Sequence, residues 1–128
     1  MKILLVEDDT VTAQSLQDLL GREGYTVDWE MSAEQAGRRL FNNRKNPDLI
    51  VLDLCIAGID GTVFLRFLKT SPDYCLIPVL VITALDSASV DEFQKAWPAQ
   101  KVVRKPFDVE EFLREIKTTI QANSPVVV

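Results

Sequence analysis

The chain has 128 residues, of which 47% are hydrophobic and 26% charged, and its net charge at pH 7 is -5. This length and balance are typical of one globular domain and exclude a disordered or fibrous protein. The acidic charge argues against a direct nucleic-acid partner, because such binding relies on clustered Lys and Arg. Histidine is absent, which excludes Ser-His-Asp and Cys-His catalysis and histidine-bearing zinc sites.

Cysteine use and hydropathy indicate where the chain works. Cys55 and Cys75 have no disulfide-like spacing, so we expect a reduced, cytoplasmic compartment. We interpret Cys55 as a buried, inert thiol. No leader sequence opens the chain and no apolar run is long enough to cross a bilayer, so we expect no membrane partner.

The first part of the chain alternates between strand and helix patterns. A continuous apolar run over Ile3–Val6 predicts a strand buried on both faces. Leucines at helical spacing follow, and Gly21 is positioned to end that helix. Residues 25–29 alternate between apolar and polar side chains, which predicts an edge strand. The pair Ser32 and Gln35 predicts the start of a second helix. The apolar stripe of this helix is Ala33, Ala36, Leu40 and Phe41.

The second part of the chain continues the alternation. Apolar runs over residues 49–52, 79–82 and 102–103 predict three more strands buried on both faces. Helical patterns separate them, the weaker one leading to Trp97. A last helix begins at Asp108. Its apolar stripe is Val109, Phe112, Leu113, Ile116 and Ile120. Five strand-helix repeats predict an α/β fold, a doubly wound parallel sheet with helices on both faces.

Polar residues follow each predicted strand, where ligand sites of such sheets lie. Glu7 and Asp8 follow the first strand, Asp53 follows the strand over 49–52, Thr83 follows the next, and Lys105 follows the last. If the first and third strands are neighbours, the three carboxylates converge in one crevice. Their repulsion is relieved by a shared proton or by a bound cation.

The residue types in this crevice suit phosphoryl transfer. Its ligands are oxygens alone, which favours a hard divalent ion, Mg²⁺ above others. An aspartate such as Asp53 can act as a nucleophile and form an acyl phosphate. Lys105 and Thr83 would then stabilise charge on the transferred oxygens.

Five short motifs at strand ends resemble the receiver domain of two-component response regulators, the CheY-like family. They are Leu5–Asp9, Leu52–Leu54, Asp60-Gly61, Ile82–Ala84 and Lys105–Phe107. The resemblance covers residues 1–121 and leaves 122–128 as a C-terminal tail or linker stub. It implies a five-stranded, flavodoxin-like sheet with strand order 2-1-3-4-5. Asp60 is most simply a structural helix cap.

The resemblance also implies roles for single residues. Asp53 would be the phosphoacceptor. Asp8, Asp53 and the backbone carbonyl of Cys55 would bind Mg²⁺ directly, or Mn²⁺ as a second acceptable ion, with Glu7 acting through a metal-bound water. The residues that would contact the phosphoryl group are Thr83, Ala84 and Lys105. The bond between Lys105 and Pro106 is often cis in this family.

The family also implies partners. A sensor histidine kinase or a histidine phosphotransfer protein would supply the phosphoryl group, and a downstream protein effector would read the result. Phosphorylation can also drive homodimer formation. The domain would not be an enzyme for external substrates, because it catalyses only its own phosphorylation and dephosphorylation.

Three positions depart from the family pattern. Ala57 stands where a proline is usual. Val102 stands where an aromatic residue normally reports phosphorylation, which puts the usual output switch in doubt. Trp97-Pro98 replaces a glycine after the fourth helix, so that helix must end differently.

Three other functions compete with a receiver. A pseudo-receiver would keep the fold and signal by binding without phosphorylation. A haloacid-dehalogenase-like phosphatase would carry D-x-D-x-T after its first strand, which residues 7–10 do not match. A flavodoxin-like cofactor binder would carry Ser, Thr and Gly in the first strand-helix turn, whereas this turn is acidic and would repel phosphate.

Overall fold

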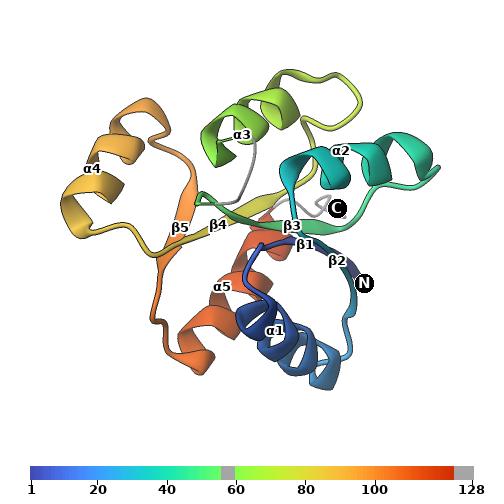
Figure 1. Ribbon diagram of the computed structural model, residues 1–128, viewed down its shortest axis with the longest axis horizontal. Coiled ribbons are helices and arrows are strands. Elements are labelled where there is room, and N and C mark those ends of the chain that lie inside the picture. The colour runs from blue at the N-terminus through green and yellow to red at the C-terminus, as the bar shows by residue number, and fades with distance from the viewer. Residues whose placement is uncertain (56–59, 123–128) are drawn as a thin grey trace, which may run out of the picture.

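The computed structural model describes residues 1–55 and 60–122, and they form a three-layer α/β domain (Figure 1). All five strands belong to one parallel sheet with the order β2-β1-β3-β4-β5. The strands are β1 Lys2–Val6, β2 Thr26–Glu30, β3 Leu49–Asp53, β4 Val79–Thr83 and β5 Lys101–Arg104. The helices are α1 Thr10–Arg22, α2 Ala33–Asn42, α3 Gly61–Thr70, α4 Ser87–Ala96 and α5 Val109–Ala122. The predicted fold class and strand order are therefore confirmed.

The helices cover both faces of the sheet. Helices α2, α3 and α4 lie on one face, and α1 and α5 lie on the other (Figure 1). Because side chains alternate along a strand, β1 contributes to two cores. Leu4 and Val6 pack on the side of α2 to α4, while Ile3 and Leu5 pack on the side of α1 and α5. This double burial explains the continuous apolar runs.

The two edges of the sheet differ from its centre. Every residue of β3 and β4 is buried, as the continuous runs predict. Strand β2 lies at one edge, as expected from its alternating pattern. Strand β5 is the other edge, and the predicted burial on both faces is complete for Val103 but only partial for Val102, which packs against the core on the side of α2 to α4.

Side-chain caps begin the helices where the sequence places acidic or hydroxyl residues. Ser32 accepts a hydrogen bond from the Gln35 N–H at 3.1 Å, and Asp60 accepts one from the Thr62 N–H at 2.8 Å. Both predicted caps are confirmed. Asp108 Oδ1 likewise accepts from the Glu110 N–H at 3.2 Å at the start of α5.

Three expectations about helix ends and faces were wrong. Gly21 lies inside α1, and the chain turns at Gly24, whose φ of 91° suits glycine. Phe41 is 83% exposed although the pattern placed it on the buried stripe. It lies one residue, about 100°, round the helix from the buried Leu40. Val109, on the first turn of α5, is 49% exposed.

Helix α4 ends without a glycine, as the sequence requires. The Trp97 N–H donates to the Phe93 carbonyl at 3.1 Å, and the Gln94 side-chain amide donates to the Trp97 carbonyl at 2.8 Å. The Lys105-Pro106 peptide is cis, as expected from the family. In the described part of the chain no helix is long and apolar enough to span a bilayer. Ala57 and residues 123–128 lie outside the described residues.

Candidate functional site at the carboxyl edge of the sheet

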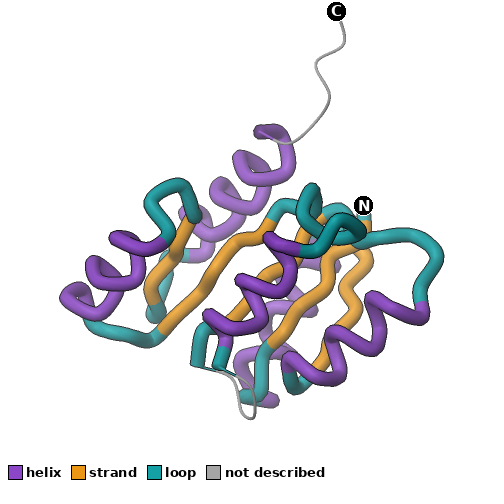
Figure 2. The backbone as a smooth tube through the Cα atoms, turned by 90° about the horizontal axis from the view of Figure 1, so that it is seen from above, coloured by secondary structure: helices purple, strands orange, loops and turns teal. Residues whose placement is uncertain are grey.

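The parallel register places the predicted site residues along one edge of the sheet. Figure 2 shows the strands side by side, with their amino ends along the upper edge of the sheet and their carboxyl ends along the lower edge. The residues before Glu7 and Asp53 pair across β1 and β3, so these carboxylates emerge at the same level. Thr83 ends β4 and Lys105 follows β5. The predicted convergence is therefore present.

Three carboxylates form a compact cluster at this edge. Glu7, Asp8 and Asp53 each place one oxygen within 4.8 Å of the others. Glu7 is 1% exposed and Asp53 is 4% exposed, while Asp8 is half-buried. Two of the three carboxylates are thus held almost out of water, where an unpaired charge is very unfavourable.

Lys105 supplies the opposing charge. Its Nζ donates to Glu7 Oε2 at 2.9 Å and to Asp53 Oδ2 at 3.1 Å. Burial by itself lowers the pKa of Lys105, but the hydrogen bonds and charges of Glu7 and Asp53 outweigh burial and raise it. The lysine therefore remains a cation between the two buried carboxylates.

Glu7 is the perturbed acid of the cluster. Its pKa is raised from 4.5 to about 7, chiefly by burial and also by the neighbouring Asp53 charge, against the lowering effect of the Lys105 hydrogen bond. Part of the Glu7 population therefore holds a proton at neutral pH in the metal-free protein. One cation, Lys105, is not enough to compensate the acids around it.

Backbone groups position the carboxylates. The Cys55 N–H donates to Asp53 Oδ1 at 2.9 Å, and the Asp9 N–H donates to Glu7 Oε1 at 3.3 Å. The indole Nε1 of Trp29, on β2, donates to the Glu7 carbonyl at 2.7 Å. Sequence reasoning missed this role of Trp29, since no local pattern connects residues so far apart in the chain.

Thr83 and Ala84 lie at the carboxyl end of β4. Thr83 is fully buried, and its hydroxyl oxygen accepts a hydrogen bond from the Leu85 N–H at 3.1 Å. Its carbonyl accepts a hydrogen bond from the Lys105 N–H at 2.6 Å, which ties the two strand ends together. Ala84, the next residue, is exposed.

The side chain of Cys55 differs from our expectation. The residue is exposed rather than buried, because it lies beyond the end of β3 in the turn that follows Asp53. Val102 is half-buried on β5 and packs against the core on the side of α2 to α4. It provides no aromatic ring at that position.

The donor set fits a magnesium ion. Oxygens around Mg²⁺ lie at about 2.0–2.1 Å from the ion and so within about 4.2 Å of each other. The carboxylate oxygens of Asp8 and Asp53 lie within 4.8 Å of each other, so a small contraction lets both bind directly, and the Glu7 oxygen at the same spacing can reach the ion through a water. Neither sulfur nor imidazole is part of this cluster, which suits a hard cation.

The acidic cluster and its lysine thus lie together at the carboxyl edge of a parallel sheet with the strand order 2-1-3-4-5. The family model of the response regulator receiver domain matches residues 3–117. The chain is also 34% identical over 125 residues to the response regulator MprA of Mycobacterium sp. (strain KMS), covering 98% of this chain and 53% of that protein. The chain therefore belongs to the response regulator receiver domain family of two-component systems.

Solved structures agree with this assignment. The signal receiver domain of a signal transduction histidine kinase from Syntrophus aciditrophicus is 27% identical with a TM-score of 0.84, covering 99% of this chain and 96% of that one. The receiver domain of the sensor histidine kinase PA1611 from Pseudomonas aeruginosa is 26% identical with a TM-score of 0.81, covering 94% and 97%, and holds a magnesium ion in its active site cleft. The present chain spans about half the length of the curated relatives that it matches.

Proposed function

We propose that this receiver domain accepts a phosphoryl group on Asp53 in a magnesium-dependent reaction. The observation that carries the proposal is the pairing of Asp53 Oδ2 with Lys105 Nζ at 3.1 Å inside a three-carboxylate cluster. The donor would be a phosphohistidine on a sensor histidine kinase or on a phosphotransfer protein. The functional domain would span residues 1–121, although α5 itself continues to Ala122.

The transfer is a displacement at phosphorus. A carboxylate oxygen of Asp53 forms the new O–P bond while the P–N bond of the phosphohistidine breaks. The electron pair of that bond returns to the imidazole nitrogen, which takes up a proton. Lys105 exchanges its ion pair with Asp53 for one with the transferred oxygens, which carry the charge in such transfers. The product is an acyl phosphate on Asp53.

The other residues hold the transferred group. Thr83 would donate its hydroxyl proton to a phosphoryl oxygen, and the backbone N–H of Ala84 would donate to a second one. A magnesium ion bound by Asp8, Asp53 and the Cys55 carbonyl, with Glu7 acting through water, would supply positive charge to the same oxygens. The phosphorylated domain would then change its contacts with a protein effector or a second copy of itself.

Intact mass spectrometry tests this function. Incubation with Mg²⁺ and acetyl phosphate should add one phosphoryl group to the wild type, and EDTA should prevent the gain. Asp53→Asn should abolish it, whereas Asp91→Asn, at an exposed aspartate of α4, should not. A parallel incubation with Mn²⁺ tests the second ion. A folded wild type that gains no mass would instead support a pseudo-receiver that signals by binding alone.

A further inference from the structure

The backbone carbonyl of Glu7 lies just past the end of the pairing between β1 and β2. The last register pair of these strands is Val6 with Glu30, and the Glu7 N–H adds one more bond, to the Glu30 carbonyl at 3.1 Å. Beyond Glu30 the chain leaves β2, and Ser32 already caps α2. Because Glu7 is almost wholly buried, its carbonyl would be costly to leave without a donor. The Trp29 indole Nε1 provides that donor at 2.7 Å.

This hydrogen bond fixes a peptide that belongs to the acidic cluster. The Glu7 carbonyl and the Asp8 N–H are parts of one planar peptide group. Strand β2 therefore holds the Glu7 backbone twice, through the Glu30 carbonyl and through the Trp29 indole. The Asp9 N–H also donates to Glu7 Oε1 at 3.3 Å, which ties the Glu7 side chain to the same turn. The direction in which Asp8 leaves β1 thus depends on Trp29.

The indole ring is itself held in place. Trp29 is half-buried and lies opposite Leu5 in the register of β1 and β2. Its ring packs against the core on the side of α1 and α5. A donor on a packed ring loses little further conformational freedom when it forms a hydrogen bond. Trp29 therefore restrains the Glu7 carbonyl more firmly than a flexible surface side chain would.

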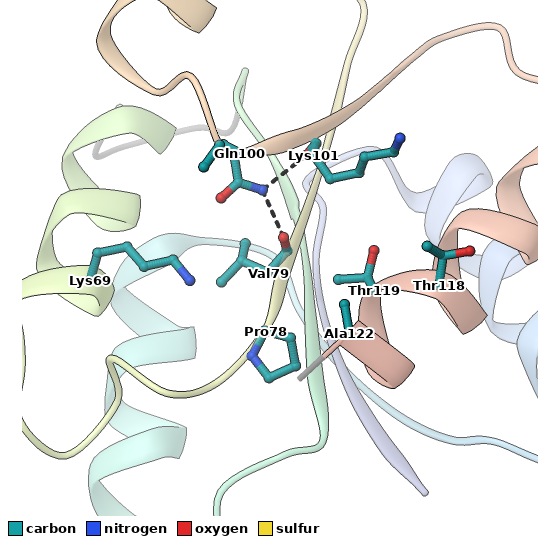
Figure 3. Close-up of a pocket in the computed structure, with 9 residues that line it drawn as sticks. Lys69, Pro78, Val79, Gln100, Lys101, Thr118, Thr119 and Ala122 are labelled. Atoms are coloured by element: carbon teal, nitrogen blue, oxygen red, sulfur yellow. Dashed lines mark hydrogen bonds between the residues drawn. The ribbon is translucent and has the colours of Figure 1, made fainter. Parts of the chain in front are cut away.

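A similar cap at the opposite edge of the sheet provides a comparison. The Gln100 side-chain Nε2 donates to the Val79 carbonyl at 2.7 Å and to the Lys101 carbonyl at 2.9 Å (Figure 3). These groups, at the amino ends of β4 and β5, border a hollow of about 320 Å³ together with Lys69. Both side chains complete hydrogen bonds that strand ends leave open. Trp29 does so beside the acidic cluster, and Gln100 does so at the other edge.

We propose that Trp29 is a positioning residue of the magnesium site, whose indole N–H holds the peptide between Glu7 and Asp8 so that the Asp8 carboxylate is directed toward Asp53. The inference rests on the proposed magnesium site. Without the indole N–H, the turn after β1 must be ordered when Mg²⁺ binds, and this ordering lowers the affinity. Residues that orient metal ligands typically change affinity by about 10- to 100-fold. Trp29 acts through the backbone, so we expect the lower end, about tenfold.

Trp29→Phe tests the proposal, because it keeps an aromatic ring and removes the donor. ¹H–¹⁵N NMR titration with MgCl₂, followed at the Asp9 and Cys55 amides beside the carboxylates, measures the affinity. Trp29→Phe should bind Mg²⁺ about tenfold more weakly than the wild type. In the metal-free protein, the Asp9 amide of this variant should exchange its hydrogen with water faster, because the turn is less restrained.

Phosphorylation kinetics distinguish positioning from general damage to the fold. The Mg²⁺ concentration that gives half the maximal rate with acetyl phosphate should rise about tenfold in Trp29→Phe. The rate at saturating Mg²⁺ should stay near that of the wild type. A merely structural role would instead lower the folded fraction, and with it the rate at every Mg²⁺ concentration.

Two variants serve as matched controls. Trp97→Phe removes a half-buried indole that packs against the opposite core, and Gln100→Met removes the cap at the other edge of the sheet. Both should keep the Mg²⁺ affinity of the wild type, whatever their effect on stability. If Trp29→Phe does not fold, benzothienylalanine, which has sulfur in place of the indole N–H, replaces Trp29 in the Trp97→Phe background. The same loss of about tenfold is expected.

The proposal is overturned if a folded protein without the Trp29 N–H binds Mg²⁺ as tightly as the wild type. It is also overturned if Trp97→Phe or Gln100→Met weakens binding equally. A wild type that binds Mg²⁺ but gains no phosphoryl group would overturn the proposed function, while the affinity loss in Trp29→Phe would still support the role of Trp29. A wild type that binds no Mg²⁺ would overturn both.

Discussion

The body and the carboxyl end of strand β3 are equally buried but chemically opposite. Leu52 is 0% exposed and the next residue, Asp53, is 4% exposed. Burying the leucine stabilises the fold by about 2 kcal/mol. Burying a carboxylate is unfavourable unless it is paired, and here the pairing group is Lys105, from beyond β5. The comparison shows that the apolar strands stabilise the domain, while their ends hold a charged site that the domain tolerates for its function.

Adjacent substitutions in β3 separate these two roles and should have the largest effects. Leu52→Ala should lower the free energy of unfolding by about 3 kcal/mol, because it opens a cavity in the core. Acetyl phosphate should still phosphorylate the folded fraction. Asp53→Asn should change stability by about 1 kcal/mol or less and abolish phosphorylation. Urea unfolding and intact mass measure the two effects, and a stable, unreactive Leu52→Ala protein would contradict this division.

Removing the cation tests how the charged end is tolerated. Lys105→Ala leaves Glu7 and Asp53 buried without their partner, so we expect a loss of about 3 kcal/mol at about pH 8. Saturating Mg²⁺ should restore part of that loss, since it binds the same carboxylates. Thermal or urea unfolding with and without Mg²⁺ measures both values.

The matched control is a surface ion pair. Arg38 and Glu34 lie 3.0 Å apart with side chains 71% and 66% exposed. Arg38→Ala should therefore change stability by about 0.5 kcal/mol or less and show no response to Mg²⁺. If Lys105→Ala and Arg38→Ala lower the free energy of unfolding equally, the burial of Lys105 and its carboxylates does not make their ion pairs more important for stability than a surface pair.

The raised pKa of Glu7 predicts a pH dependence. In the metal-free fold its pKa is raised from 4.5 to about 7, so folding takes up a proton in that window and stability falls as pH rises through it. Magnesium binding must displace this proton. Affinity for Mg²⁺ should therefore rise up to about tenfold per pH unit below about pH 7 and level off above it.

Titration of Trp29 fluorescence with Mg²⁺ at several pH values measures this dependence. Glu7→Gln should weaken Mg²⁺ binding and remove the rise of Mg²⁺ affinity with pH below about pH 7, because no proton remains to be displaced. If the Mg²⁺ affinity of Glu7→Gln still changes with pH over the same range, a group other than Glu7 is responsible for the pH dependence.

The smallest expected effect lies away from the charged end. Ser32→Ala removes the cap of α2, which accepts from the Gln35 N–H at 3.1 Å, and should lower stability by about 1 kcal/mol. Phosphorylation should not change. Ser15→Ala, on an exposed turn inside α1, is the control and should be neutral or slightly stabilising. A change in phosphorylation with Ser32→Ala would connect α2 to the site unexpectedly.

Several predictions from the sequence were wrong for one reason: a local pattern of apolar residues does not reveal which other parts of the fold will pack around them. Phe41 continues an apolar stripe, yet the helix turns it away from the sheet. Residues 102–103 resemble a central strand, yet Val102 is only half-buried, and no strand pairs beyond β5 in the described structure. Cys55 follows a buried strand, yet it already lies in an exposed turn.

The sequence by itself determined the alternation of strands and helices, the caps and the residue types that follow each strand. These depend on side-chain period and on hydrogen bonds between near neighbours, which are local properties. Only the tertiary structure decided that Lys105 contacts carboxylates 98 and 52 residues away and that Trp29 holds the Glu7 backbone. Strand order and register create those contacts, and the electrostatics of the site follow from them, because burial and pairing are properties of the assembled sheet.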